Sequence, residues 1–224
     1  MPFATIEGIR IHHAIDGNGT PLLMFAPGGF RSVMSRWTAA GGKEAMFAAY
    51  TPKEKDYSAL VSRMKQAGIS VIYVGGYHTE SALIIRQAKE QGMKATLVGG
   101  DALVTNEFWQ ISGASGEGTL MTFGPDPTKR PDAADVLKKF EAKKINPETY
   151  TLYSYAAVQI IKQAAEKAGT LDTKKVAEAI HSGMTFQTVL GKLSFDKKGD
   201  RTDADYVMYV WKKGADGKMS FVEM

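Results

Sequence analysis

The sequence predicts an α/β protein in which a parallel or mixed sheet is flanked by helices and preceded by a β-rich N-terminal segment. Residues 69–74 form an apolar, β-branched run of strand length. Such a run is typical of a strand that is buried on both faces of a parallel sheet. Residues 96–98 repeat the pattern after a helix-like segment at residues 79–92. The order strand, helix, strand favours right-handed crossovers between parallel strands.

Composition and charge exclude several function classes. The chain has 224 residues, of which 44% are hydrophobic and 23% charged, as in a globular protein with one large or two small domains. The formal net charge is +4, but the lysines are scattered and do not alternate with aromatic residues, so we expect no nucleic-acid partner. The absence of cysteine excludes disulfides and thiol catalysis. No run approaches the roughly 18 apolar residues that cross a membrane.

The first 42 residues differ in character from the rest. Residues 9–15 alternate between apolar and polar side chains, residues 16–20 indicate a turn, and residues 21–26 indicate a buried strand. The small residues at 39–42 mark a seam. We therefore predict an N-terminal strand segment at 1–42 and a main domain at 43–224. Residues 1–7 lack the basic and apolar regions of a secretion signal, so on their own they predict a cytoplasmic chain.

The motif APGGF at residues 26–30 resembles the loop after the third strand of α/β-hydrolases. In that family this loop supplies an oxyanion-hole amide. A hydrolase also needs a nucleophile in the pattern G-x-S-x-G between a strand and a helix. The nearest match is GASGE at 113–117, in which Glu117 replaces the last glycine. The only histidine after His78 is His181, at the end of a helical segment, where a helix-terminal residue without a chemical role is the simpler interpretation.

The remaining elements follow from periodicity and from turn residues. Asp56 is a plausible cap for a helix that ends at Gly68, and Thr79 and Asp172 are plausible caps for later helices. The glycine-rich residues 113–118 lack the lysine of a phosphate-binding loop. We expect strands at 45–50, 119–123, 206–211 and 219–222, the last two forming a hairpin, and helices at 108–111, 132–146, 149–169 and 173–181.

Polar side chains follow two successive strands of the predicted sheet. Tyr77 comes after the glycine pair that ends the strand at 69–74, and Asp101 comes after the glycine pair that ends the next strand. Open α/β sheets bind ligands at the carboxyl ends of their strands. We therefore expect Tyr77 and Asp101 to contact a ligand. A third group, Tyr150, Tyr153 and Tyr155, either packs with its hydroxyls in water or lines a site.

Residues 43–224 closely resemble the carboxyl-terminal half of type I periplasmic binding proteins. Within these, they resemble the branched-chain amino-acid (leucine/isoleucine/valine) binding components of ABC transporters. The resemblance extends over roughly four-fifths of the chain, with the motifs in the family's order and spacing. The motifs are DYSAL at 56–60, IYVGGYH at 72–78, LIIRQA at 83–88, YSYAAV at 153–158 and FDKKGD at 195–200.

The resemblance implies a ligand, a partner and a location. It implies an incomplete periplasmic-binding-protein fold, in which two α/β lobes close over the ligand. Tyr77 would contact a leucine-, isoleucine- or valine-like amino acid, Asp101 would face its ammonium group, and Tyr150 would line the side-chain pocket. The partner would be a membrane permease and the location the periplasm. No cofactor, metal-binding residue or catalytic residue is implied.

The sequence departs from the resembled family in one important respect. The family's first lobe, which holds the ligand's carboxylate, would lie before Lys43, where the hydrolase-like segment stands. With one wall of the cleft incomplete, we expect weak binding or none. Two alternatives stay open at this point: an esterase-like hydrolase, and a chimeric fragment whose missing contacts are restored by oligomerisation.

Overall fold

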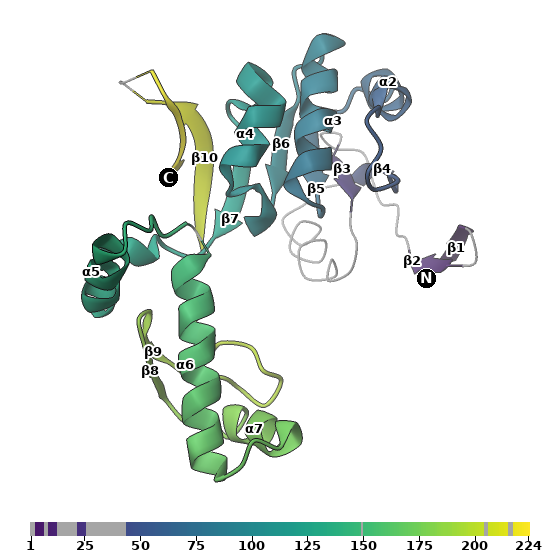
Figure 1. The fold of residues 1–224 in the computed structure, drawn as a ribbon. Coiled ribbons are helices and arrows are strands. Elements are labelled where there is room, and N and C mark those ends of the chain that lie inside the picture. The colour runs from purple at the N-terminus through teal and green to yellow at the C-terminus, as the bar shows by residue number, and fades with distance from the viewer. Residues whose placement is uncertain are drawn as a thin grey trace. The chain divides into compact units, whose positions relative to one another are not determined.

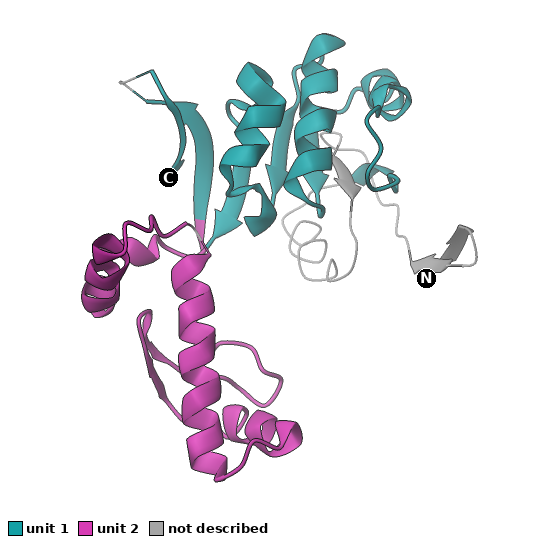
Figure 2. Cartoon of the chain, in the orientation of Figure 1, with its two compact units in different colours: residues 1–123, 208–224 teal, residues 124–207 magenta. Residues whose placement is uncertain are grey.

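The computed structural model describes two compact units separately. It gives residues 44–148, 150–203, 206–214 and 217–224 in full, and the backbone of β1 (Phe3–Ile6), β2 (Ile9–His12) and β3 (Leu22–Phe25). Unit 1 comprises residues 1–123 and 208–224, and unit 2 comprises residues 124–207 (Figure 2). Unit 2 is thus inserted into unit 1. The boundary expected between residues 42 and 43 is a different division and stays a prediction.

Unit 1 is built on a largely parallel sheet, which confirms the predicted α/β class. Its described strands pair in the order β11-β10-β7-β6-β5-β3-β4 (Figure 1). The pairs β3–β4, β3–β5, β5–β6 and β6–β7 are parallel, whereas β10 and β11 form the predicted antiparallel hairpin. The bounds not yet given are β4 (Glu44–Phe47), β5 (Val71–Val74), β6 (Thr96–Gly99), β7 (Leu120–Phe123), β10 (Val207–Lys213) and β11 (Met219–Glu223).

One strand of the N-terminal segment joins this sheet. β3 lies between β4 and β5 and is parallel to both. β1 and β2 instead pair with each other as a separate antiparallel ribbon. The APGGF motif at 26–30 and the seam at 39–42 lie outside the described residues.

Strand β5 is fully buried on one face and half-buried on the other, so the expected burial on both faces is met in full on one face only. In β5, Ile72 and Val74 are fully buried, whereas Val71 and Tyr73 are half-buried. β6 shows the same alternation, with Leu97 buried and its neighbour Val98 half-buried. A run of β-branched residues favours a strand and places apolar side chains on both faces of the sheet. It does not reveal which of the two faces is covered by other parts of the chain.

The helices of unit 1 connect the strands. The helices α2 (Ser58–Gln66), α3 (His78–Glu90) and α4 (Asn106–Ser112) follow β4, β5 and β6, with short 3₁₀ turns η1 (Asp101–Leu103) and η2 (Gly113–Gly116) beside α4. Asp56 is not the N-cap of α2, which is Tyr57, but its Oδ1 accepts a hydrogen bond from Ser58 N at 2.8 Å just before the helix. Thr79 does not cap α3: the helix begins one residue earlier, and Tyr77 is its N-cap. Tyr77, three residues after β5, is still extended, with φ −84° and ψ 165°.

The returning strand is fixed to unit 1 by Trp211. Its side chain is fully buried, and its Nε1 donates to Leu103 O at 3.0 Å. Its backbone N donates to Thr119 O at 3.0 Å, and its O accepts from Gly118 N at 2.8 Å. Its ring stacks on Phe108, with the centroids 5.9 Å apart. The chain that leaves unit 1 after β7 is therefore brought back beside it.

Unit 2 contains three helices and a short ribbon among its described residues. They are α5 (Ala134–Ala142), α6 (Thr151–Ala168), α7 (Thr173–Ile180), β8 (Phe186–Thr188) and β9 (Gly191–Leu193), with 3₁₀ turns η3 (Pro127–Lys129) and η4 (Pro131–Ala133) before α5. The cap predicted for α7 is confirmed, since Asp172 Oδ1 accepts from Lys175 N at 3.1 Å. The β8–β9 ribbon was not expected, because its strands are too short to show a period.

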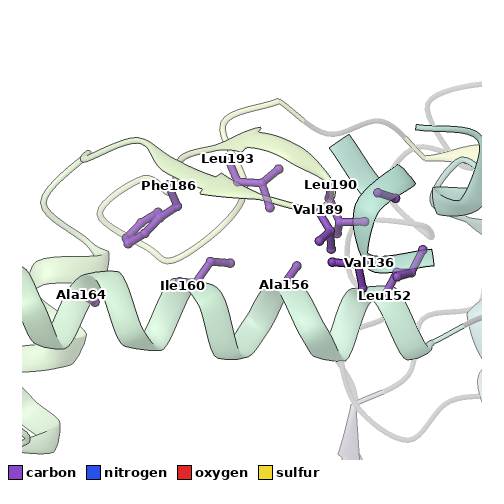
Figure 3. Close-up of a cluster of buried hydrophobic side chains, with 10 residues drawn as sticks. Val136, Leu152, Ala156, Ile160, Ala164, Phe186, Val189, Leu190 and Leu193 are labelled. Carbon is purple, nitrogen blue, oxygen red and sulfur yellow. The ribbon is translucent and has the colours of Figure 1, made fainter. Parts of the chain in front are cut away.

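The core of unit 2 lies between α6 and this ribbon (Figure 3). Two glutamines of α6 also bind the ribbon's edge: Gln159 Oε1 accepts from Val189 N at 2.9 Å, and Gln163 exchanges two hydrogen bonds with the backbone of Gln187. One face of α6 is thereby fully used. The buried cluster comprises Ala133, Val136, Leu152, Ala156, Ile160, Ala164, Phe186, Val189, Leu190 and Leu193.

A buried carboxyl group at the start of β4 makes the stability of the chain depend on pH. Glu44 is 6% exposed, and its Oε1 has no hydrogen-bond partner within the described residues. Burial raises the pKa of Glu44 from 4.5 to about 7, because the charged form loses its hydration. Between these two values the folded state binds more protons than the unfolded state, so stability decreases as the pH rises through this window.

We predict that Glu44→Gln removes this dependence. The variant should be more stable than the parent above pH 7, by up to about 3 kcal/mol, because it no longer buries a charge. Urea unfolding at pH 5 and pH 8 measures the difference, with Glu117→Gln at an exposed position as the control. Equal pH profiles for the parent and Glu44→Gln would contradict the assignment.

Candidate functional site

Two neighbouring strands deliver the predicted ligand contacts to the same edge of the sheet. β5 and β6 are parallel, and Val74 pairs with Gly99 at their carboxyl ends. Tyr77 follows β5 by three residues and Asp101 follows β6 by two. Because the segments after β5 and β6 leave the sheet in the same direction, the structure brings Tyr77 and Asp101 to one edge of unit 1.

Tyr77 combines a fixed backbone with an exposed ring. Its carbonyl oxygen accepts hydrogen bonds from Ser81 N at 3.2 Å and from Ser81 Oγ at 2.8 Å. These bonds hold the N-terminal turn of α3. The side chain itself is 73% exposed, which leaves the ring accessible to a ligand.

Asp101 begins a tight turn directly after β6. It is the first residue of η1, and its carbonyl oxygen accepts from Val104 N at 2.9 Å. Its side chain is exposed. Gly99 leaves room behind it, since a Cβ there would lie 2.4 Å from Leu103 Cδ1. The turn thus presents the Asp101 carboxylate at the end of β6, while the backbone at Gly99 packs against the Leu103 side chain.

Tyr50 is a residue of this edge that sequence reasoning missed. It follows β4, which is separated from β5 by β3, yet its hydroxyl reaches the backbone after β5. A Cβ at Gly76 would lie 1.6 Å from Tyr50 Oη, so glycine is the residue that leaves room for the phenol. Burial, followed by the nearby charge of Glu80, raises the pKa of Tyr50 to about 12. The phenol therefore keeps its proton at neutral pH.

The loop that carries Tyr50 is held by side chains of α3. Glu80 is buried, and its Oε1 accepts from Lys53 N at 3.0 Å. Gln87 Oε1 accepts from Tyr57 N at 2.7 Å, and its Nε2 donates to Lys55 O at 3.2 Å. The helix that begins at Tyr77 therefore also positions the loop at 50–57.

The three tyrosines around the start of α6 have different environments. Tyr150, 41% exposed, is the N-cap of α6, and Tyr155 is exposed on that helix. Tyr153 Oη donates to Pro125 O at 3.1 Å, which fixes it to the segment after β7. All three belong to unit 2, whereas Tyr77 and Asp101 belong to unit 1. The role of Tyr150 as a wall of the site stays a prediction.

The geometry does not favour the hydrolase alternative. Ser115, the candidate nucleophile, lies in η2, after helix α4 and before strand β7. A nucleophile elbow needs the opposite order, a strand before the serine and a helix after it. Within the fully described ranges, no three His, Asp or Glu side chains gather as metal ligands. No helix of the described part is long and apolar enough to cross a membrane.

Comparison with known families identifies the fold. A family model described as periplasmic binding protein matches residues 25–218, which include strands β5 to β7 and the whole of unit 2. The chain belongs to the periplasmic binding protein family. This is a family of binding proteins rather than of enzymes. The match begins at residue 25, inside the segment that the sequence alone set apart as hydrolase-like.

Curated relatives are similar over most of this periplasmic binding protein chain. A Leu/Ile/Val-binding protein homolog 1 of Brucella suis is 51% identical over 183 residues, which are 82% of this chain and 49% of that protein. An amino acid binding protein of Pseudomonas aeruginosa is 43% identical over 76% of this chain and 46% of its own length. The chain therefore spans about half the length of the curated relatives it matches.

Solved structures share the fold at lower identity. The leucine binding protein LivK of Thermotoga maritima superposes with a TM-score of 0.73 at 24% identity, covering 91% of this chain and 59% of its own. A periplasmic binding protein type 1 of Bordetella pertussis gives a TM-score of 0.75 at 21% identity, covering 92% of this chain and 61% of its own. These likenesses support the fold class predicted from the sequence.

The contact between Tyr50 and Gly76 predicts a coupled pair of substitutions. Gly76→Ala should destabilise unit 1 by about 1–3 kcal/mol, because the added Cβ overlaps the Tyr50 hydroxyl. Most of that cost should disappear when Tyr50→Ala is also present. Urea unfolding of the two single variants and the double variant measures the coupling. Gly100→Ala, whose Cβ has no atom within 4 Å, is the control, and equal costs at Gly76 and Gly100 would refute the contact.

Proposed function

We propose that this chain is part of the substrate-binding component of an ABC transporter and that it binds a branched-chain amino acid. The observation that carries the proposal is the placement of Tyr77 and Asp101 at the ends of two paired parallel strands. The naming of the relatives as Leu/Ile/Val-binding and amino acid binding proteins supports it.

The chemistry of the edge suits a zwitterion with an apolar side chain. The Asp101 carboxylate attracts the ammonium group, and the Tyr77 ring covers the ligand's carbon atoms. The Tyr50 phenol, protonated at neutral pH, packs against the backbone at Gly76 behind this edge. From the family resemblance alone, we also propose that Tyr150 lines the ligand's side-chain pocket.

The finer properties of the chain follow from the same proposal. We propose that it performs no catalysis, that it delivers its amino acid to a membrane permease, and that it acts in the periplasm as its family does. The likeness of residues 26–30 to a hydrolase loop stays a proposal based on sequence alone. An esterase would need Ser115 as its nucleophile, which gives the alternative a direct test.

Calorimetric titration with leucine, isoleucine and valine tests the function. We expect saturable binding to the parent chain and an affinity at least about tenfold lower for Asp101→Asn, since one charge-assisted hydrogen bond contributes about 1.5–3 kcal/mol. Asp135→Asn, an exposed aspartate of α5, is the matched control and should bind as the parent does.

Two results would contradict the proposal. The first is equal binding by Asp101→Asn and the parent. The second is hydrolysis of p-nitrophenyl acetate by the parent that Ser115→Ala abolishes, because it would establish the esterase alternative.

A further inference from the structure

The first residue of α3 contacts a side chain of α4 next to the candidate site. His78 follows Tyr77 in the chain, and its Nε2 lies 3.6 Å from Glu107 Oε2, at ion-pair distance for a protonated imidazole. The side chain of His78 is 29% exposed and that of Glu107 is 63% exposed. Glu107 belongs to the first turn of α4, the helix that lies beside α3 (Figure 1). The contact therefore joins the segment after β5 to the segment after β6.

The carboxylate of Glu107 is also held by the N-cap of its own helix. Thr105 Oγ1 donates a hydrogen bond to Glu107 Oε2 at 3.0 Å, and the same hydroxyl accepts from Glu107 N at 3.4 Å. The Glu107 oxygen that meets His78 is thus the one that Thr105 binds. Through this oxygen, the imidazole of His78 is connected to the residue at which α4 begins.

The turn that carries Asp101 ends at this cap. Leu103 N donates to Gly100 O at 3.2 Å, and Val104 N donates to Asp101 O at 2.9 Å, so the turn is compact from its first residue. One end of the turn is fixed by the sheet at Gly99, which pairs with β5. The other end passes directly into Thr105 and α4. The position of Asp101 relative to Tyr77 therefore depends on how the start of α4 is held.

A second contact between the same two helices lies away from the candidate site. Arg86 Nη1 donates to Ile111 O at 3.0 Å, about two helical turns along α3 from His78. That bond holds the far end of α4, whereas the contact of His78 with Glu107 lies beside the strand ends. Exposed ion pairs contribute little to global stability, so the consequence of this one is sought in the local order of the site.

We propose that His78 and Glu107 are positioning residues of the ligand-binding edge. Their contact holds the turn that carries Asp101 against the start of the helix that follows Tyr77. The carboxylate and the ring then face a ligand at a set separation, and neither His78 nor Glu107 has to touch the ligand. The consequence for ligand affinity rests on the proposed function, whereas the consequence for the turn does not.

Amide hydrogen exchange of the full chain without ligand tests the positioning by itself. His78→Leu should speed exchange at the bonded amides of Leu103 and Val104 by about two- to fivefold, the range expected when one exposed ion pair is lost. His78→Gln should exchange nearly as the parent does, because its amide can still donate to Glu107. Both variants should keep the parent's unfolding midpoint, which separates a loosened turn from misfolding.

The matched control removes another exposed ion pair of the same helix. Glu90→Gln breaks the contact of Glu90 with Arg86, whose atoms are 3.7 Å apart, and should leave exchange at Leu103 and Val104 unchanged. Equal exchange in His78→Leu and the parent would overturn the proposal. So would an equal acceleration in Glu90→Gln, because the effect would then belong to α3 as a whole.

Calorimetric titration with leucine supplies the functional measurement. His78→Leu and Glu107→Gln should each lower the affinity by about two- to fivefold, and the double variant should bind no more weakly than either single one, because both remove the same contact. Full affinity in His78→Leu, despite faster exchange of the turn, would overturn the proposal. If the parent itself binds no leucine, the proposed function fails, and the exchange rates decide the positioning of the turn on their own.

Discussion

The register between β5 and β6 is the constraint on which the site depends. Because Val74 pairs with Gly99, the segments that follow β5 and β6 leave the sheet side by side, each through a pair of glycines. A shift of one residue would move every side chain of a strand to the other face. The shift would bury the polar ends or expose the core. Hydrophobic burial of Ile72 and Leu97 thus fixes the position of Tyr77 and Asp101 at the edge.

Helix α3 holds in place both the segment after β5 and the loop that follows β4. Its first turn holds the backbone of Tyr77, while Glu80 and Gln87 hold the loop at 50–57. One helix therefore positions side chains from two strand ends that are not adjacent in the sheet. Trp211 likewise holds β10 to the turn after β6, because its indole donates a hydrogen bond to Leu103 O in η1.

Short sequence patterns correctly predicted the features that depend on a few neighbouring residues, such as strand ends and one helix cap. The positions of Tyr77 and Asp101 at strand ends follow from short apolar runs and glycine pairs, and the Asp172 cap follows from helix-start chemistry. The contact of Tyr50 with Gly76 could not be predicted, because the two residues meet only through the order of strands in the sheet. The cap predicted at Thr79 was wrong because α3 already begins at His78, which places Thr79 inside the helix rather than before it.

The central claim is that the ends of β5 and β6 together form one ligand-binding edge. Amide chemical shifts of the full chain, followed by NMR during titration with leucine, test it most directly. The account predicts saturable shifts concentrated at residues 75–78 and 99–102, with much smaller changes along α2 and α7. Unchanged shifts at both strand ends at millimolar leucine, or changes confined to another part of the chain, would contradict it.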